Sequence, residues 1–139
     1  MTPLDREVLA ERVAAVERHL ARVAERLPPD PSELRPGTDA SDAVILHLWQ
    51  AVQIVLDLAL ATCVHVKMGT PSSYADAFAL LEKGGCLDGP LADRLRRAAA
   101  FRNVIAHSYG KLDLERVHRA ALEGPNDLRA FMAVVRDLV

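Results

Sequence analysis

The chain has 139 residues, of which 50% are hydrophobic and 4% aromatic, and its formal net charge is −2. This length supports one domain with a substantial core, and a composition rich in alanine, leucine and valine favours closely packed helices. An acidic chain has no overall attraction for nucleic acid, so a surface that binds it must be local.

The cysteines and the N-terminal segment indicate where the protein resides. Cys63 and Cys86 are too few and too irregularly placed for a disulfide framework, and Cys63 lies in an apolar segment where a thiol behaves as a small hydrophobe. Residues 1–12 carry charges from Asp5 onward and lack the apolar core of a signal peptide. Together these features predict a cytoplasmic protein.

The first predicted helix extends from Leu4 to Leu27. Its apolar residues recur at spacings of four and three, which places them along one narrow seam. The seam comprises Leu9, Val13, Val16, Leu20, Val23 and Leu27. We expect it to pack within its own bundle, although such a seam can also mediate self-association. Pro28 and Pro29 end the helix and begin a proline-rich linker over residues 28–41.

The second predicted helix begins with Ser41 or Asp42 as its N-cap and ends near Met68. It is apolar enough to raise the question of a membrane span. Four polar residues argue against a span, because they fall within roughly a third of the helix circumference. These residues are His47, Gln50, Gln53 and Asp57. The pattern favours the nearly buried central helix of a soluble bundle.

The polar stripe of this helix has two interpretations. It can face solvent or a second subunit, which we favour, or it can line a functional cleft. In the second case, Asp57 is a candidate to orient His107 or to pair with Arg102.

The remaining elements are also helical. Helices are predicted over residues 73–83 and 90–106, and Pro90 suits the first turn of the latter. Two short helices, over residues 114–122 and 126–138, are predicted on either side of a Gly-Pro pair. The sequence shows no strand-like alternation and no internal repeat, so the predicted fold class is all-α.

Four polar side chains interrupt the apolar pattern near the end of the helix predicted over residues 90–106. The segment AAAFRNVIAHSYGK, residues 98–111, contains Arg102, Asn103, His107 and Tyr109. On a continuous helix Asn103 and His107 share a face and Arg102 lies beside them. Alternatively, the helix ends near residue 106, and His107 and Tyr109 lie on the turn that follows. In either geometry the four side chains can converge.

Metal-free cleavage of RNA requires a guanidinium and an imidazole. Arginine binds phosphate oxygens bidentately and stabilises charge that develops on phosphorus. Histidine can take a proton from the ribose 2′-hydroxyl or give one to the leaving oxygen. One histidine cannot easily do both, so a symmetric dimer that supplies two would complete the site. An isolated pair of this kind more often stabilises a helix end, and Tyr109 can simply bond a backbone group at the turn.

Basic residues are concentrated around the same segment. Residues 94–111 include five basic side chains and no acidic one: Arg94, Arg96, Arg97, Arg102 and Lys111. In an acidic chain this strip is the expected place for a polyanion. Arg97 and Lys111 are therefore candidate contacts for RNA phosphates beside Arg102.

The other histidines and cysteines do not suggest a metal site. Cys63 and His65 are two residues apart and lie on different helix faces, and no set of ligands has metal-site spacing. We therefore expect neither a metal nor another cofactor. His19 and His118 lie among charged neighbours and are expected to be exposed.

The segment RNVIAHSY fits the pattern R-x4-H-x-Y with a polar residue directly after the arginine. It resembles the signature of HEPN domains of the HepT-like type. The resemblance extends over residues 42–113, through the long apolar helix, the segment PSSYADAFALLEK, a glycine-rich turn and the motif helix. The long linker and the absence of a strongly basic surface depart from the family pattern.

The resemblance implies a single antiparallel bundle of four to six helices over residues 1–139, which dimerises and places both motifs in an interface cleft. It implies an endoribonuclease toxin of a type II toxin–antitoxin pair. The partner would be a minimal nucleotidyltransferase antitoxin that transfers AMP to the motif tyrosine; neither a membrane nor DNA is expected as a partner. By position, Arg102 and His107 would be catalytic, Asn103 would assist, and Tyr109 would be modified.

An alternative function is a non-catalytic helical module. HEPN-like bundles also resemble accessory domains that bind nucleotides or the substrate of a separate nucleotidyltransferase. In that case Arg102 and the basic strip hold a phosphate and nothing is cleaved. We prefer the enzyme, because a phosphate holder needs the arginine but not a histidine and a tyrosine in fixed register.

Overall fold

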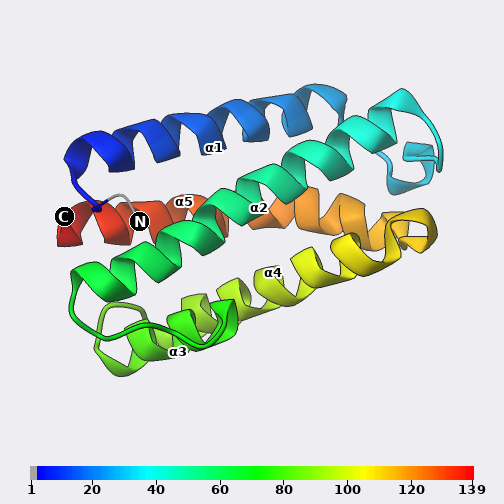
Figure 1. Cartoon of the computed structure of the whole chain (residues 1–139). Helices are drawn as coiled ribbons and strands as arrows, with labels where there is room; N and C mark the ends of the chain where they lie inside the picture. The colour runs from blue at the N-terminus through cyan, green and yellow to red at the C-terminus, as the bar shows by residue number, and fades with distance from the viewer. Residues whose placement is uncertain (1–2) are drawn as a thin grey trace.

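The computed structural model describes residues 3–139 (Figure 1). Across this range the chain forms five α-helices and two 3₁₀ helices and contains no β-strand, which confirms the all-α prediction. The elements are α1 (Arg6–Arg26), η1 (Pro31–Glu33), α2 (Asp39–His65), α3 (Tyr74–Lys83), α4 (Gly89–Ser108), η2 (Tyr109–Lys111) and α5 (Leu114–Leu138).

Helix α2 is the centre of the bundle. It contacts α1, α3, α4 and α5, and Figure 1 shows it running between α1 on one side and α3 and α4 on the other. Leu48, Val55, Leu56 and Leu58 are almost completely buried, and each such side chain contributes about 1.5–3 kcal/mol of burial free energy. By length and composition α2 resembles a membrane span, yet half of its most apolar window lies inside the bundle, as in the core helix of a soluble protein.

The start of α2 differs from the prediction. Thr38 is the N-cap, because its hydroxyl oxygen accepts a hydrogen bond from the Ser41 amide at 3.2 Å. Ser41, predicted as a cap, lies in the first turn and is buried. Asp42, the other predicted cap, is therefore available to side chains from elsewhere in the chain. The linker is correspondingly shorter than residues 28–41 and contains η1.

Helix α1 packs along α2 through the predicted seam. Leu9, Val16, Leu20 and Val23 are buried, which confirms the spacing argument. Asp5 caps the helix by accepting a hydrogen bond from the Val8 amide at 2.8 Å.

The C-terminal segment forms one helix, not the two short helices predicted from its Gly-Pro pair. Helix α5 continues through Pro125, although an interior proline costs roughly 3 kcal/mol. Buried residues precede and follow the proline on one helix face, including Val117, Ala121, Leu128 and Phe131. Their combined burial exceeds the cost of the proline. Phe131 also packs edge-on against Phe78 of α3, with ring centroids 5.5 Å apart.

Both histidines that were predicted to be exposed are at least partly buried. His118 is 2% exposed, and its Nε2 donates a hydrogen bond of 2.7 Å to the Pro28 carbonyl oxygen. This bond ties α5 to the end of α1. His19 is half-buried, and its Nδ1 lies 3.0 Å from the Nδ1 of His47 on α2.

Candidate functional site

Helix α4 carries the polar cluster that the sequence analysis identified. Asp88 caps the helix through the Leu91 amide at 2.7 Å, and Leu91, Leu95, Phe101 and Ile105 anchor it in the core. The helix continues to Ser108, so His107 lies within it and not on the following turn. Tyr109 begins the 3₁₀ turn η2 directly afterwards.

Neutral groups and aromatic rings hold Arg102 in place. Its Nε donates a hydrogen bond of 2.7 Å to Gln53 Oε1, and its Nη1 donates one of 3.0 Å to Asn103 Oδ1. Its guanidinium carbon lies 5.7 Å from the ring centroid of Trp49 and 5.8 Å from that of Tyr74. Within residues 3–139, no carboxylate lies within salt-bridge distance of Arg102. Its positive charge is therefore oriented but not neutralised.

Gln53 is fixed by a second set of hydrogen bonds. Its Nε2 donates to Asp57 Oδ1 at 3.1 Å and to the Tyr74 hydroxyl oxygen at 3.0 Å, and the Tyr74 hydroxyl donates to Asp57 Oδ1 at 3.1 Å. With both amide hydrogens engaged, the Gln53 carbonyl oxygen is directed at Arg102. Asp57 therefore supports Arg102 through Gln53; the predicted direct pairing with Arg102 or His107 is not formed.

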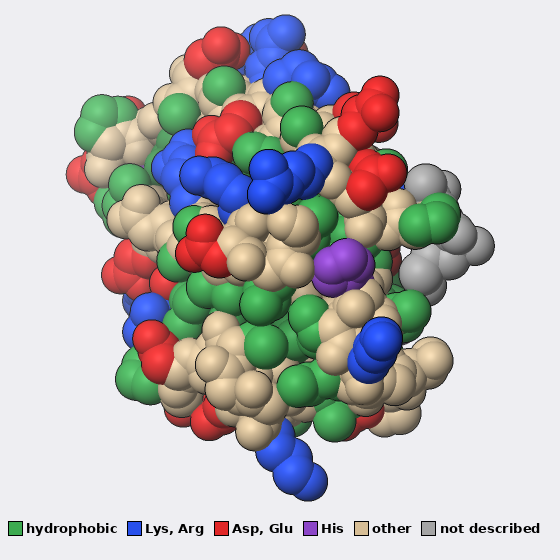
Figure 2. All heavy atoms as spheres, turned by 90° about the vertical axis from the view of Figure 1, so that its left-hand side faces the viewer, with side chains coloured by type: hydrophobic (Ala, Val, Ile, Leu, Met, Phe, Trp, Pro, Cys, Tyr) green, Lys and Arg blue, Asp and Glu red, His purple; other side chains and the backbone are tan. Residues whose placement is uncertain are grey.

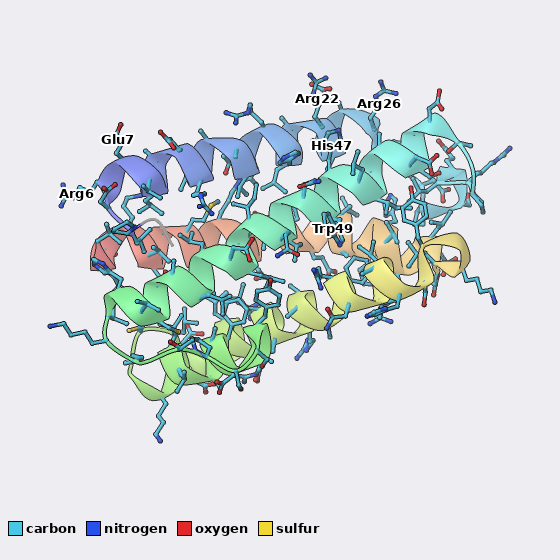
Figure 3. The ribbon with its side chains drawn as sticks, in the orientation of Figure 1. Arg6, Glu7, Arg22, Arg26, His47 and Trp49 are labelled. Atoms are coloured by element: carbon cyan, nitrogen blue, oxygen red, sulfur yellow. The ribbon has the colours of Figure 1, made fainter. Side chains whose placement is uncertain are left out.

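The predicted polar stripe of α2 consequently divides between two faces. Figure 3 shows His47 directed toward α1 and Trp49 directed toward the opposite side of α2. Gln53 and Asp57 join the Arg102 cluster, whereas His47 pairs with His19.

His107 and Tyr109 follow the cluster in sequence, at the C-terminal end of α4 and the start of η2. His107 is exposed, and its imidazole has no hydrogen-bond partner in the part of the chain that the structure describes. Tyr109 is 51% exposed, and its hydroxyl donates to Asp42 Oδ1 at 3.2 Å, not to a backbone group. Partial burial and the neighbouring Asp42 carboxylate raise the pKa of the Tyr109 phenol. The phenol therefore stays protonated at neutral pH.

Trp49 connects the two parts of the cluster. One side of its ring is near Arg102, and the residue also lines a shallow hollow with Ile105, Ala106 and Tyr109. Arg102 and Tyr109 therefore both lie against α2, at its contact with α4 and η2.

The predicted basic strip is not continuous. Arg94 pairs with Asp127 at 2.8 Å, and Arg96 pairs with Glu82 and Asp93. Arg97 lies on the side of α4 that faces α5, where it lines a separate hollow. Basic and acidic side chains also lie next to one another on the end of the bundle shown in Figure 2.

Arg97 lines the hollow that faces α5 and not the one beside Trp49 and Tyr109, and its contact with RNA phosphates stays a prediction. Arg97 and His107 each lie five positions from Arg102, which turns each of them by roughly 140° away from it around the axis of α4. Lys111 is exposed in η2, next to the cluster in sequence.

Two residues of the site were missed or undervalued. Gln53 was predicted, as part of the polar stripe, to face solvent or a second subunit. Tyr74 was not predicted to be a site residue. The available signal was their polarity on otherwise apolar helices.

In residues 3–139 no three or more His, Cys, Asp or Glu side chains are arranged to hold a metal ion. Burial also raises the pKa of the Cys63 thiol to about 11.

The structure thus defines an all-α bundle that carries an arginine, a histidine and a tyrosine near the C-terminal end of α4. A family model described as ribonuclease HepT-like matches residues 16–135. The chain belongs to this HepT-like ribonuclease family, which confirms the resemblance. The match also includes the second half of α1 and most of α5, beyond the residues 42–113 on which the resemblance rested.

Individual relatives agree with this assignment. The mRNA nuclease HepT of Shewanella oneidensis is 25% identical over 130 residues, covering 94% of this chain and 97% of its own. A relative from Archaeoglobus fulgidus is 31% identical over 111 residues, covering 79% of this chain and 77% of its own.

Solved structures share the fold. The tri-AMPylated HEPN toxin of Shewanella oneidensis, in complex with an MNT antitoxin, has a TM-score of 0.84 and 25% identity, with 96% of this chain and 99% of that chain covered. A toxin–antitoxin structure with AMP-PNP has a TM-score of 0.85 and 24% identity, with 95% and 99% covered. The HEPN-type bundle predicted from the motif is thus confirmed.

Proposed function

We propose that this chain is a metal-independent endoribonuclease and the toxin of a toxin–antitoxin pair. The observation that carries the proposal is the environment of Arg102. Gln53 and Asn103 orient its guanidinium, no carboxylate neutralises it, and an exposed imidazole follows five residues later on the same helix. Family membership and the nuclease relative support the same function.

The chemistry follows from these two groups. The His107 imidazole takes the proton of the ribose 2′-hydroxyl, and the 2′-oxygen forms a bond to phosphorus. The bond from phosphorus to the 5′-oxygen breaks, and an imidazolium gives that oxygen a proton. Arg102 binds the non-bridging oxygens, on which negative charge accumulates. The products are a 2′,3′-cyclic phosphate and a 5′-hydroxyl.

A homodimer would supply the two histidines that this reaction needs. Leu46 is 50% exposed beside the cluster, and Trp49 is only half-buried. These apolar side chains make the α2–α4 side a suitable interface between two copies. One cluster from each copy would then provide the base and the acid.

The proposed antitoxin is a nucleotidyltransferase that modifies Tyr109. The phenol oxygen would attack the α-phosphorus of ATP, with release of pyrophosphate and loss of the phenol proton. Tyr109 is accessible enough for this reaction, since about half of its surface is exposed. The attached AMP would place a negative phosphate beside the cluster and so compete with RNA for Arg102.

A non-catalytic phosphate-binding module is the alternative. It is favoured by one observation, namely that nothing in the described part of the chain orients the His107 imidazole. On this alternative Arg102 binds a nucleotide phosphate and no bond is broken.

The test uses protein expressed without a partner and incubated with RNA in EDTA. His107→Ala should reduce the cleavage rate by about 10²–10⁴-fold while the dimer stays folded. His65→Ala is the matched control, since His65 is also exposed and near the end of a helix. An unmodified, folded wild-type protein that binds AMP through Arg102 but leaves RNA intact would establish the alternative.

A further inference from the structure

A second hollow lies between α4 and the first half of α5. These helices pack side by side (Figure 1), and α2 contributes the floor between them. The hollow has a volume of about 290 Å³. Its apolar lining comprises Leu48, Val52, Ala98, Phe101, Ala120 and Leu128. We call it the α4–α5 groove.

Arginines surround this apolar floor. Arg94, Arg97, Arg116 and Arg119 line the groove together with only two carboxylates, Glu123 and Asp127. Four positive and two negative charges leave an excess of two positive charges, in a chain whose net charge is −2. The groove is therefore positively charged, although the chain as a whole is negatively charged.

Two of these arginines have no role in holding the fold. Arg94 pairs with Asp127, and the guanidinium carbon of Arg116 lies 5.8 Å from the ring centroid of Phe101. Arg97 and Arg119 are exposed and have no carboxylate within salt-bridge distance in residues 3–139. Like charges that share one groove repel each other, and a bound anion relieves that repulsion.

The wall contributed by α5 leaves room for a ligand. Gly124 lines the groove without a side chain, and a Cβ atom placed there would meet nothing within 4 Å. This position of α5 therefore adds open space next to the arginines.

We propose that the α4–α5 groove binds one nucleotide of the RNA strand outside the cleavage site. The phosphate would lie between Arg97 and Arg119, and the base would lie on the apolar floor against the Arg116 guanidinium, which can stack on a base. The volume is at the lower limit for ligand pockets, which suits a single nucleotide and not a partner helix about 10 Å wide. This inference rests on the proposed nuclease function.

The position of the groove suits an extended substrate. Arg97 and Arg102 are five residues apart on α4, which corresponds to about 7.5 Å along the helix axis and roughly 140° around it. A single strand that leaves the Arg102 cluster would cross α4 and reach the groove. RNA long enough to occupy both places should therefore bind more tightly than a short fragment.

The test compares two variants that lose the same charge. Arg97→Gln/Arg119→Gln alters the groove, whereas Arg18→Gln/Arg26→Gln alters exposed residues of α1. Both are made in the His107→Ala background, and their affinity for a labelled 12-nucleotide single strand is measured by fluorescence anisotropy at several salt concentrations. The groove variant should bind about tenfold more weakly than the control, with a slope of log K on log[salt] that is shallower by about 1.4.

Three further binding measurements make the test more specific. A dinucleotide, which can occupy only one of the two places at a time, should show a smaller difference in affinity between the two variants than the 12-nucleotide strand. Asp127→Asn removes a negative charge and releases Arg94, so it should tighten binding of the longer strand. AMP is the third probe: dependence on Arg97 and Arg119 for AMP but not for RNA would overturn the RNA assignment and indicate a site for free nucleotides.

Failure of this inference is distinguishable from failure of the proposed function. Cleavage by the same chains with His107 intact is measured in parallel. Equal RNA affinity of the groove and control variants, in a protein that cleaves RNA, would overturn the groove and leave the nuclease. Weaker RNA binding by the groove variant, in a protein that never cleaves, would overturn the nuclease and leave the groove as a binding site.

Discussion

The arginines of helix α4 have two different kinds of partner. In its first half, Arg94 and Arg96 pair with carboxylates of α5 and α3. Near its C-terminal end, Arg102 is held by the amide oxygens of Gln53 and Asn103 and by two aromatic rings. The first arrangement links helices, and the second positions a cation without neutralising it.

The difference shows how a small, acidic protein can present a phosphate-binding group. A carboxylate partner would orient Arg102 equally well but would compete with phosphate for the same N–H donors. The amide oxygen of Gln53 accepts a hydrogen bond from Arg102 but carries no negative charge, so the positive charge of the guanidinium is not neutralised. Counting basic residues along the sequence therefore overestimated the anion-binding surface, because it did not separate paired arginines from amide-held ones.

The largest expected effect follows from replacing Arg102 itself. Arg102→Lys keeps the positive charge but loses the planar fork and the Nε donor to Gln53. We expect the RNA cleavage rate to fall by about 10²-fold or more, in single-turnover assays with a labelled oligonucleotide. Arg96→Lys is the matched control on the same helix. Comparable loss in both variants would mean that the two kinds of arginine do not differ in function.

The next-largest effect is expected when Gln53, the neutral partner of Arg102, is replaced by a charged residue. Gln53→Glu places a carboxylate beside Arg102, so RNA affinity should fall about tenfold, the equivalent of ~1.4 kcal/mol. Gln50→Glu adds the same charge to the same helix away from the hydrogen bonds of Arg102 and serves as control. Gln53→Leu should instead lower the free energy of unfolding by about 1–3 kcal/mol, since the groups bonded to Gln53 lose their partner. An unchanged affinity in Gln53→Glu would contradict a role for the neutral amide.

A smaller effect is expected for a carboxylate-paired arginine. Arg96→Gln removes the pairs with Glu82 and Asp93. The melting temperature should fall by a few degrees at most, because exposed pairs contribute little. Cleavage should remain at the wild-type rate. A large loss of cleavage with an unchanged melting temperature would show that Arg96 also serves the substrate.

The smallest effect concerns the histidines of α1 and α2. Burial, the neighbouring His47 and then Arg18 lower the pKa of His19 below its usual 6.5. The unfolded chain therefore binds this proton more readily than the folded chain, and stability should fall as the pH decreases below about 7. Urea unfolding at pH 7.5 and 5.5 measures this loss, which His19→Gln should reduce. The His19→Gln variant should leave the pH profile of RNA cleavage unchanged, and a changed cleavage profile would refute this separation of stability from activity.

The sequence was sufficient for the parts of the molecule that depend on local pattern. The seam of α1, the nearly buried α2 and the position of the motif at the end of α4 follow from spacing and composition, and the structure agrees. The family was likewise recognisable from Arg102, Asn103, His107 and Tyr109 together.

What the sequence could not provide is the rotation of each helix about its axis. Gln53 and Arg102 are 49 positions apart, and no local pattern indicates that their side chains meet. For the same reason His118 was predicted to be exposed, although it is buried. For α5, the proline rule competed with an apolar period that continues from Val117 to Val135. Tertiary burial decided in favour of the continuous helix.

The contact between the start of α1 and the last residue of the chain has a practical consequence for engineering. The Arg6 Nε donates a hydrogen bond of 3.4 Å to the Val139 carbonyl oxygen, and Figure 1 places this contact at the opposite end of the bundle from η2. Because Arg6 and Val139 are adjacent, a short peptide could join the start of α1 to the end of α5, and the chain could be reopened in the linker before α2, giving a circular permutant. A fluorescent reporter or surface tether attached near residue 139 would likewise leave the Tyr109 end of the bundle unobstructed.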